Sequence, residues 1–239
     1  MSDFDPAART NEADLSALGG RSGGGRSGGV RSPWVVGVSG ASGTPYARAV
    51  LNGLLDAHLP VDLVVSRAAR LTILDETGLA FRDSHWRDDL ATWLSRDVGE
   101  VTYWSAGDLA AGPASGSYPA RGMVVVPAST AAVAGIAIGL SKDLLQRAAD
   151  VTLKERRPFV IVPRETPYTR ATLQHLLTLH DAGAIVLPAS PGFYSAPQSV
   201  AQLVDFVAAK VLDAIGVEHD LITRWTGVLG AAVDAQQPR

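Results

Sequence analysis

Apolar and polar residues follow one another along the chain in blocks that predict strands and helices in turn. Mostly apolar runs, too short for helices, predict strands at 35–38, 61–66, 123–127, 159–163 and 184–188. Apolar residues at helical spacing predict helices at 44–58, 67–77, 86–97, 130–139, 143–156, 169–181 and 198–215. Runs that are apolar throughout suit strands buried on both faces of a parallel sheet. We therefore expect an α/β fold with an open, doubly wound, Rossmann-like parallel sheet in a single domain.

The two ends of the chain depart from this pattern. Residues 1–32 contain GGRSGGGRSGGVRS, a Gly/Ser/Arg-rich repeat whose side chains cannot form a core. We expect a disordered tail over 1–32, one folded domain over 33–230 and a flexible C-terminus over 231–239.

Composition narrows the class of protein further. A chain of 239 residues with 46% hydrophobic residues can bury one sizeable core. With a formal net charge of -3, the protein has no overall positive potential that would attract nucleic acid or an anionic membrane. The absence of cysteine excludes disulfides and thiolate nucleophiles, and the five histidines show no metal-ligand spacing. The histidine spacing leads us to expect no metal site. No apolar run reaches the length of a membrane span, so we expect a cytoplasmic protein.

The residues that follow the predicted strands are the candidates for a ligand site, because doubly wound sheets bind ligands at the carboxyl ends of their strands. All of these segments are polar or small: SGASGTPY at 39–46, SR at 66–67, PAST at 127–130, PRETP at 163–167 and PASPGFY at 188–194. The sequence therefore predicts one crevice lined by these five segments.

Two of the segments each allow a functional and a structural interpretation. The glycine-rich 39–46 could offer backbone N–H groups to a phosphate or an electron-rich ring, or could be an ordinary tight turn. It lacks the G-x-G-x-x-G pattern, and no acidic residue follows Ser66, so a mononucleotide is favoured over NAD. Ser129 and Thr130 could cap the next helix and still present hydroxyl groups to a ligand.

Charged residues flank the predicted strand 159–163 on both sides. Arg164 and Glu165 follow the strand and belong to the ligand side, whereas Arg156 and Arg157 precede it and belong to the opposite edge. Glu165 could act in the crevice or form a simple ion pair with Arg164. The topology alone does not assign Lys154 to either edge.

Several motifs together make the sequence resemble the UbiX family, the flavin prenyltransferases, over about residues 34–225. They are VSGASGTPYA at the first strand, SRAA at 66–69, SGSY at 115–118, RAADVTLKERRPFVIVPRETP at 147–167, PGFYSAPQSV at 191–200 and RW at 224–225. The resemblance implies an enzyme that transfers a dimethylallyl group from dimethylallyl phosphate to N5 and C6 of reduced FMN without a metal ion. The product would be prenylated FMN, the cofactor of UbiD-type decarboxylases. The resemblance also implies a homododecamer with sites shared between subunits.

Individual roles follow from the resemblance position by position. It implies FMN contacts from Gly40, Ala41, Ser42, Ser66, Ser129, Thr130, Ala131, Ala132, Arg147 and Arg164. Dimethylallyl phosphate would be bound by Lys154, Arg164, Tyr194 and Lys210. The catalytic residues would be Ser42, Glu76, Lys154 and Glu165, of which Lys154 and Glu76 would serve a neighbouring subunit's site. Cations and a hydroxyl suit this chemistry, because phosphate leaves readily only when positive groups and hydrogen-bond donors stabilise the negative charge that develops on it.

The chain also departs from the family pattern, and two other functions remain open. Lys210 stands where some members carry Arg, which keeps the charge but loses the bidentate fork. Ala128, Ala131 and Leu109 stand where Cys, a longer side chain and Trp occur in some members. A flavoprotein of the cysteine-decarboxylase type is disfavoured, because the chain has only two methionines and no PxMNxxMW-like segment. The remaining alternative is a non-catalytic FMN carrier or an accessory subunit of an aromatic-acid decarboxylase.

Overall fold

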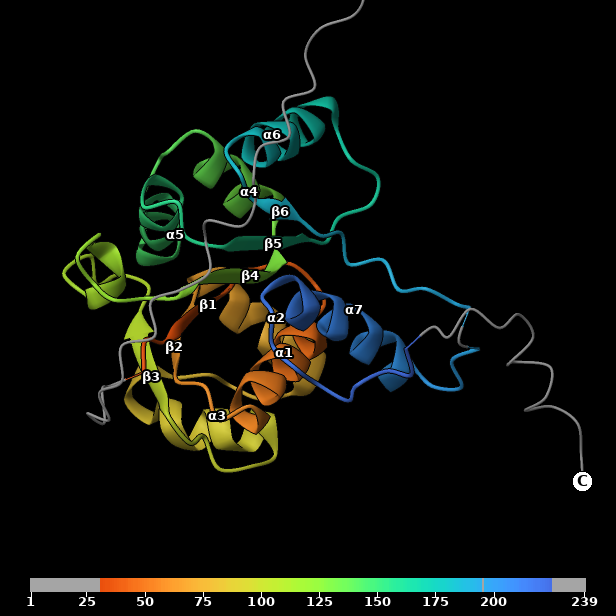
Figure 1. The fold of residues 1–239 in the computed structure, drawn as a ribbon. Helices are drawn as coiled ribbons and strands as arrows, with labels where there is room; N and C mark the ends of the chain where they lie inside the picture. The colour runs from red at the N-terminus through yellow and green to blue at the C-terminus, as the bar shows by residue number, and fades with distance from the viewer. Residues whose placement is uncertain (1–30, 195, 225–239) are drawn as a thin grey trace, which may run out of the picture. The chain divides into compact units, whose positions relative to one another are not determined.

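The fold is a single six-stranded parallel sheet, seen in a computed structural model that describes residues 31–194 and 196–224 (Figure 1). The strands are β1 (Trp34–Val38), β2 (Val61–Val65), β3 (Val101–Ser105), β4 (Gly122–Ala128), β5 (Phe159–Pro163) and β6 (Ile185–Val186). Their order is β3-β2-β1-β4-β5-β6, and every neighbouring pair is parallel. The predicted open, doubly wound α/β fold is thus confirmed, with the strand order reversing between β1 and β4.

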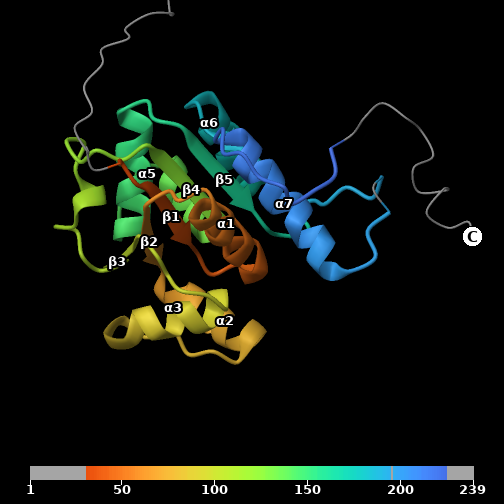
Figure 2. The ribbon, with the colours of Figure 1, turned by 60° about the horizontal axis from the view of Figure 1, so that its bottom comes forward.

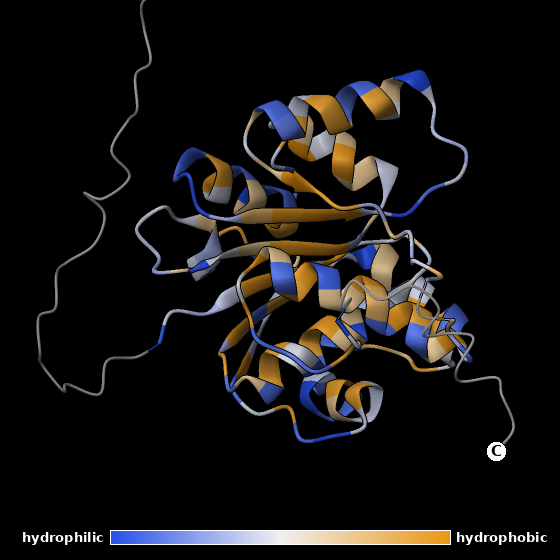
Figure 3. Ribbon diagram, turned by 45° about the vertical axis from the view of Figure 1, so that its right-hand side comes forward, coloured by the Kyte–Doolittle hydropathy of each residue, from blue (hydrophilic) through white to orange (hydrophobic). Residues whose placement is uncertain are grey.

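Helices cover both faces of the sheet (Figures 1 and 2). One face carries α1 (Thr44–Asp56), α2 (Arg67–Thr77), α3 (Trp86–Leu94) and α7 (Val200–Ala214). The other carries α4 (Thr130–Ala137), α5 (Leu144–Lys154) and α6 (Arg170–Asp181). Short 3-10 turns lie at Asp83–His85 and Gly112–Ala114. Each face therefore has its own apolar core, and in Figure 3 the central strands are hydrophobic along most of their length.

The strand prediction needs two corrections, both at the edges of the sheet. Strand β3 was not predicted, because only Val101 of its five residues is buried and the run VTYWS lacks a continuous apolar pattern. β6 spans only Ile185–Val186, shorter than the predicted 184–188. Both are the edge strands of the sheet, where burial on one side is incomplete and the sequence signal is weaker.

Some expectations fall outside the residues that the structure describes. Of the predicted tail 1–32 only residues 31 and 32 are described, and the C-terminus 231–239 lies outside, so the domain bounds stay predictions. Ser195 and Trp225, within two of the family motifs, also lie outside. Among the helices of the described ranges, none has the length and apolar character needed to cross a membrane.

Candidate active site

A cavity of about 330 Å³ opens at the carboxyl edge of the sheet, beside the point where the strand order reverses. This is the place where a doubly wound sheet binds its ligands. The cavity is lined by Ser39, Gly40, Ser66, Arg67, Ala68, Leu71, Ser129, Ala131, Ala132, Lys142, Asp143, Leu145 and Gln146. Five of the ten predicted FMN contacts are among them, namely Gly40, Ser66, Ser129, Ala131 and Ala132.

Serine side chains fix the floor of this cavity. The Ser39 hydroxyl donates to the carbonyl oxygen of Pro127 at 2.9 Å and accepts from the Ser129 N–H at 2.7 Å, which ties the ends of β1 and β4 together. The Ser129 hydroxyl accepts from the Ala132 N–H and caps α4, so the predicted capping role is confirmed. Thr130, predicted as a second capping candidate, is instead the first residue of α4.

The N-termini of α2, α4 and α5 all meet the cavity. Their capping residues Ser66, Ser129 and Asp143 line it, and each accepts a hydrogen bond from a backbone N–H of its own helix. A helix N-terminus carries a partial positive charge. The neutral serine caps leave that of α2 and α4 to favour an anionic or electron-rich ligand, whereas the Asp143 carboxylate offsets that of α5.

Gly40 allows the loop after β1 to lie directly on α2. A Cβ atom at this position would be 2.4 Å from the Cβ of Ala68, well inside contact distance. Any side chain would therefore push the loop and α2 apart. Glycine leaves a flat backbone surface at the wall of the cavity, which suits a planar ring.

The N-terminus of α1 is occupied by a side chain of the protein itself. Glu76 from α2 accepts hydrogen bonds from the Gly43 and Thr44 N–H groups, both at 2.8 Å, and from the Thr44 hydroxyl at 2.6 Å. Burial raises the pKa of Glu76, but the hydrogen bonds from Thr44, Ser42 and Gly43 outweigh it and hold the pKa below its usual range. The amides of residues 43–44 are therefore not open to a phosphate. The structure gives Glu76 a capping role, and its catalytic role stays a prediction.

Replacement of Glu76 by Gln is expected to lower the free energy of unfolding by about 1 kcal/mol, as for loss of a helix N-cap. Because the pKa of Glu76 is lowered in the folded protein, its ionised form stabilises the fold at pH values above the ordinary titration range of Glu. This contribution fades as the pH falls, so the difference between wild type and variant should shrink below about pH 4.3. Urea unfolding from pH 3.5 to 7.5 measures it, with Asp75→Asn as the control on the same helix. A difference independent of pH would contradict the assigned ionised cap.

Arg164 and Glu165 lie at the end of β5, as predicted. The Arg164 Nε donates to the carbonyl oxygen of Ser42 at 3.0 Å, so the guanidinium lies against the glycine loop. Glu165 is exposed and accepts from the Thr166 N–H at 2.9 Å. Among the ion pairs within 31–194 and 196–224, none joins Glu165 to Arg164, so the simple salt-bridge interpretation gains no support.

Arg147 and Lys154 do not line the cavity, although both lie on α5. The Arg147 side chain donates to the Ala114 carbonyl oxygen at 3.2 Å and to Asp150 at 2.8 Å. Lys154 ends the helix and forms an ion pair with Glu155. Because α5 begins at the cavity, Lys154 lies about 15 Å further along the helix axis, toward the amino edge of the sheet.

The surroundings of Lys154 form what we call the basic edge, made of Lys154, Arg157 and the segment 115–118. The Arg157 guanidinium donates to the Gly116 carbonyl oxygen at 2.7 Å. A Cβ on Gly116 would be 2.6 Å from the Lys154 Nζ, so this glycine lies directly against the lysine. Arg157 thus lies at the edge opposite to the cavity, as the topology predicts.

Tyr194 and Lys210 share one side of α7. The Tyr194 ring packs edge-to-face on Phe206, with 5.8 Å between ring centroids. Phe206 is one helical turn before Lys210, so the two side chains emerge on the same face. Tyr194 and Lys210 are both about half exposed, and neither lines the cavity. Of the predicted phosphate ligands, Lys154 thus lies at the amino edge of the sheet and Arg164 at the carboxyl edge.

Comparison with known proteins identifies the family. The sequence matches the Flavoprotein family over residues 26–212. It is 65% identical over 211 residues to the flavin prenyltransferase UbiX of Streptomyces coelicolor, covering 84% of this chain and 98% of the relative. The chain belongs to the UbiX family.

Solved structures agree with this assignment. A UbiX protein crystallised with FMN and dimethylallyl pyrophosphate has 32% identity and a TM-score of 0.72, covering 83% of this chain and all of that one. A dodecameric FMN-dependent UbiX-like protein from Escherichia coli O157:H7 has 36% identity and a TM-score of 0.72, covering 82% of this chain and all of that one. The resemblance read from the sequence motifs is thus confirmed.

Part of the cavity of this UbiX-family chain was not predicted. The segment 142–146 contributes Lys142, Asp143, Leu145 and Gln146, yet it follows a loop rather than a strand. The signal for it was an Asp directly before an apolar helix, which is typical of an N-cap. Gln146 is 2% exposed, and its side-chain Oε1 accepts from the Lys142 N–H at 3.3 Å.

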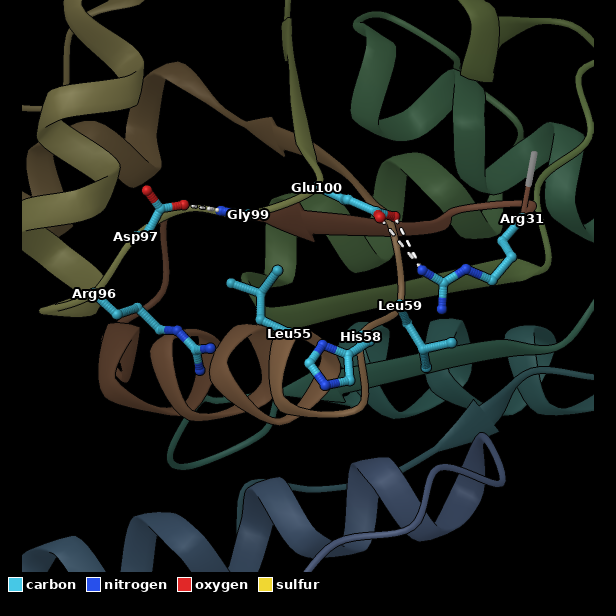
Figure 4. A pocket seen from close by; sticks show the side chains of 8 residues that line it. All are labelled: Arg31, Leu55, His58, Leu59, Arg96, Asp97, Gly99 and Glu100. Atoms are coloured by element: carbon cyan, nitrogen blue, oxygen red, sulfur yellow. Dashed lines mark hydrogen bonds and ion pairs between the residues drawn. The ribbon is translucent and has the colours of Figure 1, made fainter. Parts of the chain in front are cut away.

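A larger cavity, of about 500 Å³, lies at the amino edge of the sheet (Figure 4). It lies between the end of α1 and the segments before β1 and β3. Arg31 pairs with Glu100 at 3.3 Å across it, and Asp97 accepts from the Gly99 N–H. The charges of Arg31 and Glu100 thus pair with each other, and this edge of the sheet is opposite to the one where doubly wound sheets bind ligands. Size alone does not make it the active site.

Proposed function

We propose that this protein is a flavin prenyltransferase, which transfers the dimethylallyl group of dimethylallyl phosphate to N5 and C6 of reduced FMN. The observation that supports it is the combination of a cavity at the switch point, lined by five family FMN positions, with separate basic groups for a second phosphate. An FMN carrier needs a single anion site. The UbiX structure solved with both FMN and dimethylallyl pyrophosphate has the same fold.

The residues around the cavity fit a flavin. Gly40, Ala131 and Ala132 provide small surfaces for a flat ring, and the serine-capped N-termini of α2 and α4 provide positive potential. Bound reduced FMN supplies the electron-rich ring that accepts the allylic group. Arg164 holds the loop at Ser42 in place and leaves its remaining N–H groups for an anion.

The basic residues act on the donor. Lys154, Arg164 and Lys210, with the Tyr194 hydroxyl, bind the phosphate and stabilise the negative charge that grows on it as the carbon–oxygen bond breaks. Such groups allow the phosphate to leave the allylic carbon without a divalent ion. Glu165 gives a proton to the departing phosphate or removes one during ring closure, as a general acid or base.

The site is completed by other copies of the chain. Lys154 lies at the amino edge of the sheet and Arg164 at its carboxyl edge, so within one protomer a single phosphate cannot contact both. We propose a homododecamer in which Lys154 serves a neighbour's site. Exposed apolar side chains suited to contacts between copies lie on and near α4 and α6, at Ile138, Leu140, Leu173 and Leu177.

We further propose a cytoplasmic protein that delivers prenylated FMN to a UbiD-type decarboxylase. Anaerobic incubation with FMN, a reductant and dimethylallyl phosphate tests the transfer, with the donor omitted as a control. The expected mass spectrum shows a flavin heavier by one C5 unit, and a parallel run with the diphosphate shows which donor is preferred. Folded, flavin-bound protein that returns only unmodified FMN would support the carrier instead.

A further inference from the structure

Asp213, in the last turn of α7, contacts three basic side chains. Its Oδ1 accepts from Arg224 at 2.9 Å and from the His219 Nε2 at 3.2 Å. Its Oδ2 lies 3.6 Å from the Lys210 Nζ, one turn earlier on the helix. The carboxylate therefore joins a predicted donor ligand to the segment that follows α7.

The chain after α7 turns back to place Arg224 beside the helix. Gly216, with φ of 69°, ends α7, and the Val217 N–H donates to the Leu212 carbonyl oxygen at 2.9 Å. Val217 is buried, and Leu221 packs against the same core as α7. The return of Arg224 to Asp213 is thus set by an ordered turn with apolar anchors.

The three contacts of Asp213 are unequal. Arg224 and His219 make hydrogen bonds to the same oxygen, whereas Lys210 is beyond hydrogen-bond distance and 51% exposed. His219 accepts the Leu221 N–H at its Nδ1, which leaves its Nε2 to donate to Asp213. Burial raises the pKa of Asp213, but the hydrogen bonds from Arg224 and His219 outweigh it and lower the pKa. Asp213 is ionised, and Arg224 supplies its counter-charge.

We propose that Arg224 is a positioning residue for the donor site, which neutralises Asp213 and so keeps the Lys210 ammonium group available to the phosphate. This inference rests on the proposed function, in which Lys210 binds dimethylallyl phosphate. With Arg224 present, the cluster of Asp213, Arg224 and Lys210 carries one net positive charge. Without it, the net charge is zero and Asp213 draws Lys210 along the helix, away from the donor.

The test measures donor binding and turnover in the full chain loaded with FMN. Arg224→Gln is expected to raise both the KM and the dissociation constant of dimethylallyl phosphate about three- to fivefold, the size of a partly exposed charge pair. The kcat and the affinity for FMN should change less than about twofold, because Arg224 is not placed at the flavin. Calorimetric titration of donor into protein with oxidised FMN reads binding without turnover.

A second substitution separates the electrostatic role from a structural one. Asp213→Asn, added to Arg224→Gln, keeps an acceptor for His219 but removes the charge that draws Lys210, so donor affinity should return to the wild-type value. Arg31→Gln, which breaks the exposed pair with Glu100, is the matched control and should leave the donor constants unchanged. An Arg224→Gln protein with unchanged donor affinity, or a double variant without recovery, overturns the inference.

Lys210→Met distinguishes this failure from failure of the proposed function. It should weaken donor binding about tenfold or more, as for loss of a charge-assisted hydrogen bond. If it does so while Arg224→Gln has no effect, only the role of Arg224 is wrong. If Lys210→Met leaves donor binding unchanged, the donor site itself is misassigned and the inference fails with it.

Discussion

Glu165→Gln is expected to retain FMN and to slow formation of prenylated FMN by about 10²- to 10⁴-fold, the range for loss of a general acid or base. Glu165 is exposed at the carboxyl end of β5, and its described hydrogen bond is to the adjacent Thr166 N–H. Gln keeps the shape and can still accept that bond, but it cannot exchange a proton. Single-turnover kinetics with saturating donor isolates the chemical steps from donor binding.

The matched control for this variant is Glu100→Gln, an exposed carboxylate at the opposite edge of the sheet. It should leave the rate within about twofold of wild type, since surface substitutions away from a site have small effects. FMN affinity, read from the flavin spectrum, should be the same in all three proteins. Wild-type turnover in Glu165→Gln would remove this residue from the mechanism.

The central strands were predictable because burial on both faces leaves a plain signal. β1, β4 and β5 are continuous apolar runs, and their boundaries match the prediction to within one residue. β3 was missed because its side chains are partly exposed at the edge of the sheet. Its Tyr103 packs against Phe81 and Trp86, with ring centroids 5.4 and 5.8 Å away. The enrichment of VTYW in β-branched and aromatic residues was the signal that could have found it.

Half of the site was predictable from topology. Ser66 and Ser129 follow strands, and a parallel sheet brings such positions to one edge. The helix beginning near 143 was predicted, but its place in the cavity wall was not, because it approaches the cavity from a loop rather than from a strand. Likewise, the capping of α1 by Glu76 joins residues 32 positions apart and follows from no local pattern. Such contacts depend on how helices pack on the sheet, which periodicity does not encode.

Neither the sequence nor the structure of one chain shows which site Lys154 serves. The sequence places it in a family motif, and the structure places it on the basic edge, about 15 Å along α5 from the cavity. If Lys154 binds the donor at all, a different copy must provide it. We therefore expect the way in which copies of the chain assemble to determine which residues meet at the phosphate.

Mixed oligomers of Lys154→Met and Glu165→Gln are expected to regain activity that neither variant has alone. Lys154→Met should lower turnover about 10²- to 10³-fold, because a cation that meets the developing phosphate charge is lost. Each site takes Glu165 from one chain and Lys154 from another. In a mixed oligomer, a site is intact when its Glu165 comes from a Lys154→Met chain and its Lys154 comes from a Glu165→Gln chain. With equal and random mixing in a symmetric oligomer, about one quarter of the sites are intact.

Co-expression of the two variants with different affinity tags and sequential purification on both tags yields these mixed oligomers. Each parent variant, purified in the same way with two tags, is the control. The account predicts about one quarter of wild-type turnover in the mixed oligomers and almost none in either parent. Mixed oligomers no more active than their parents, or a Lys154→Met parent with wild-type turnover, would contradict a phosphate site shared between copies.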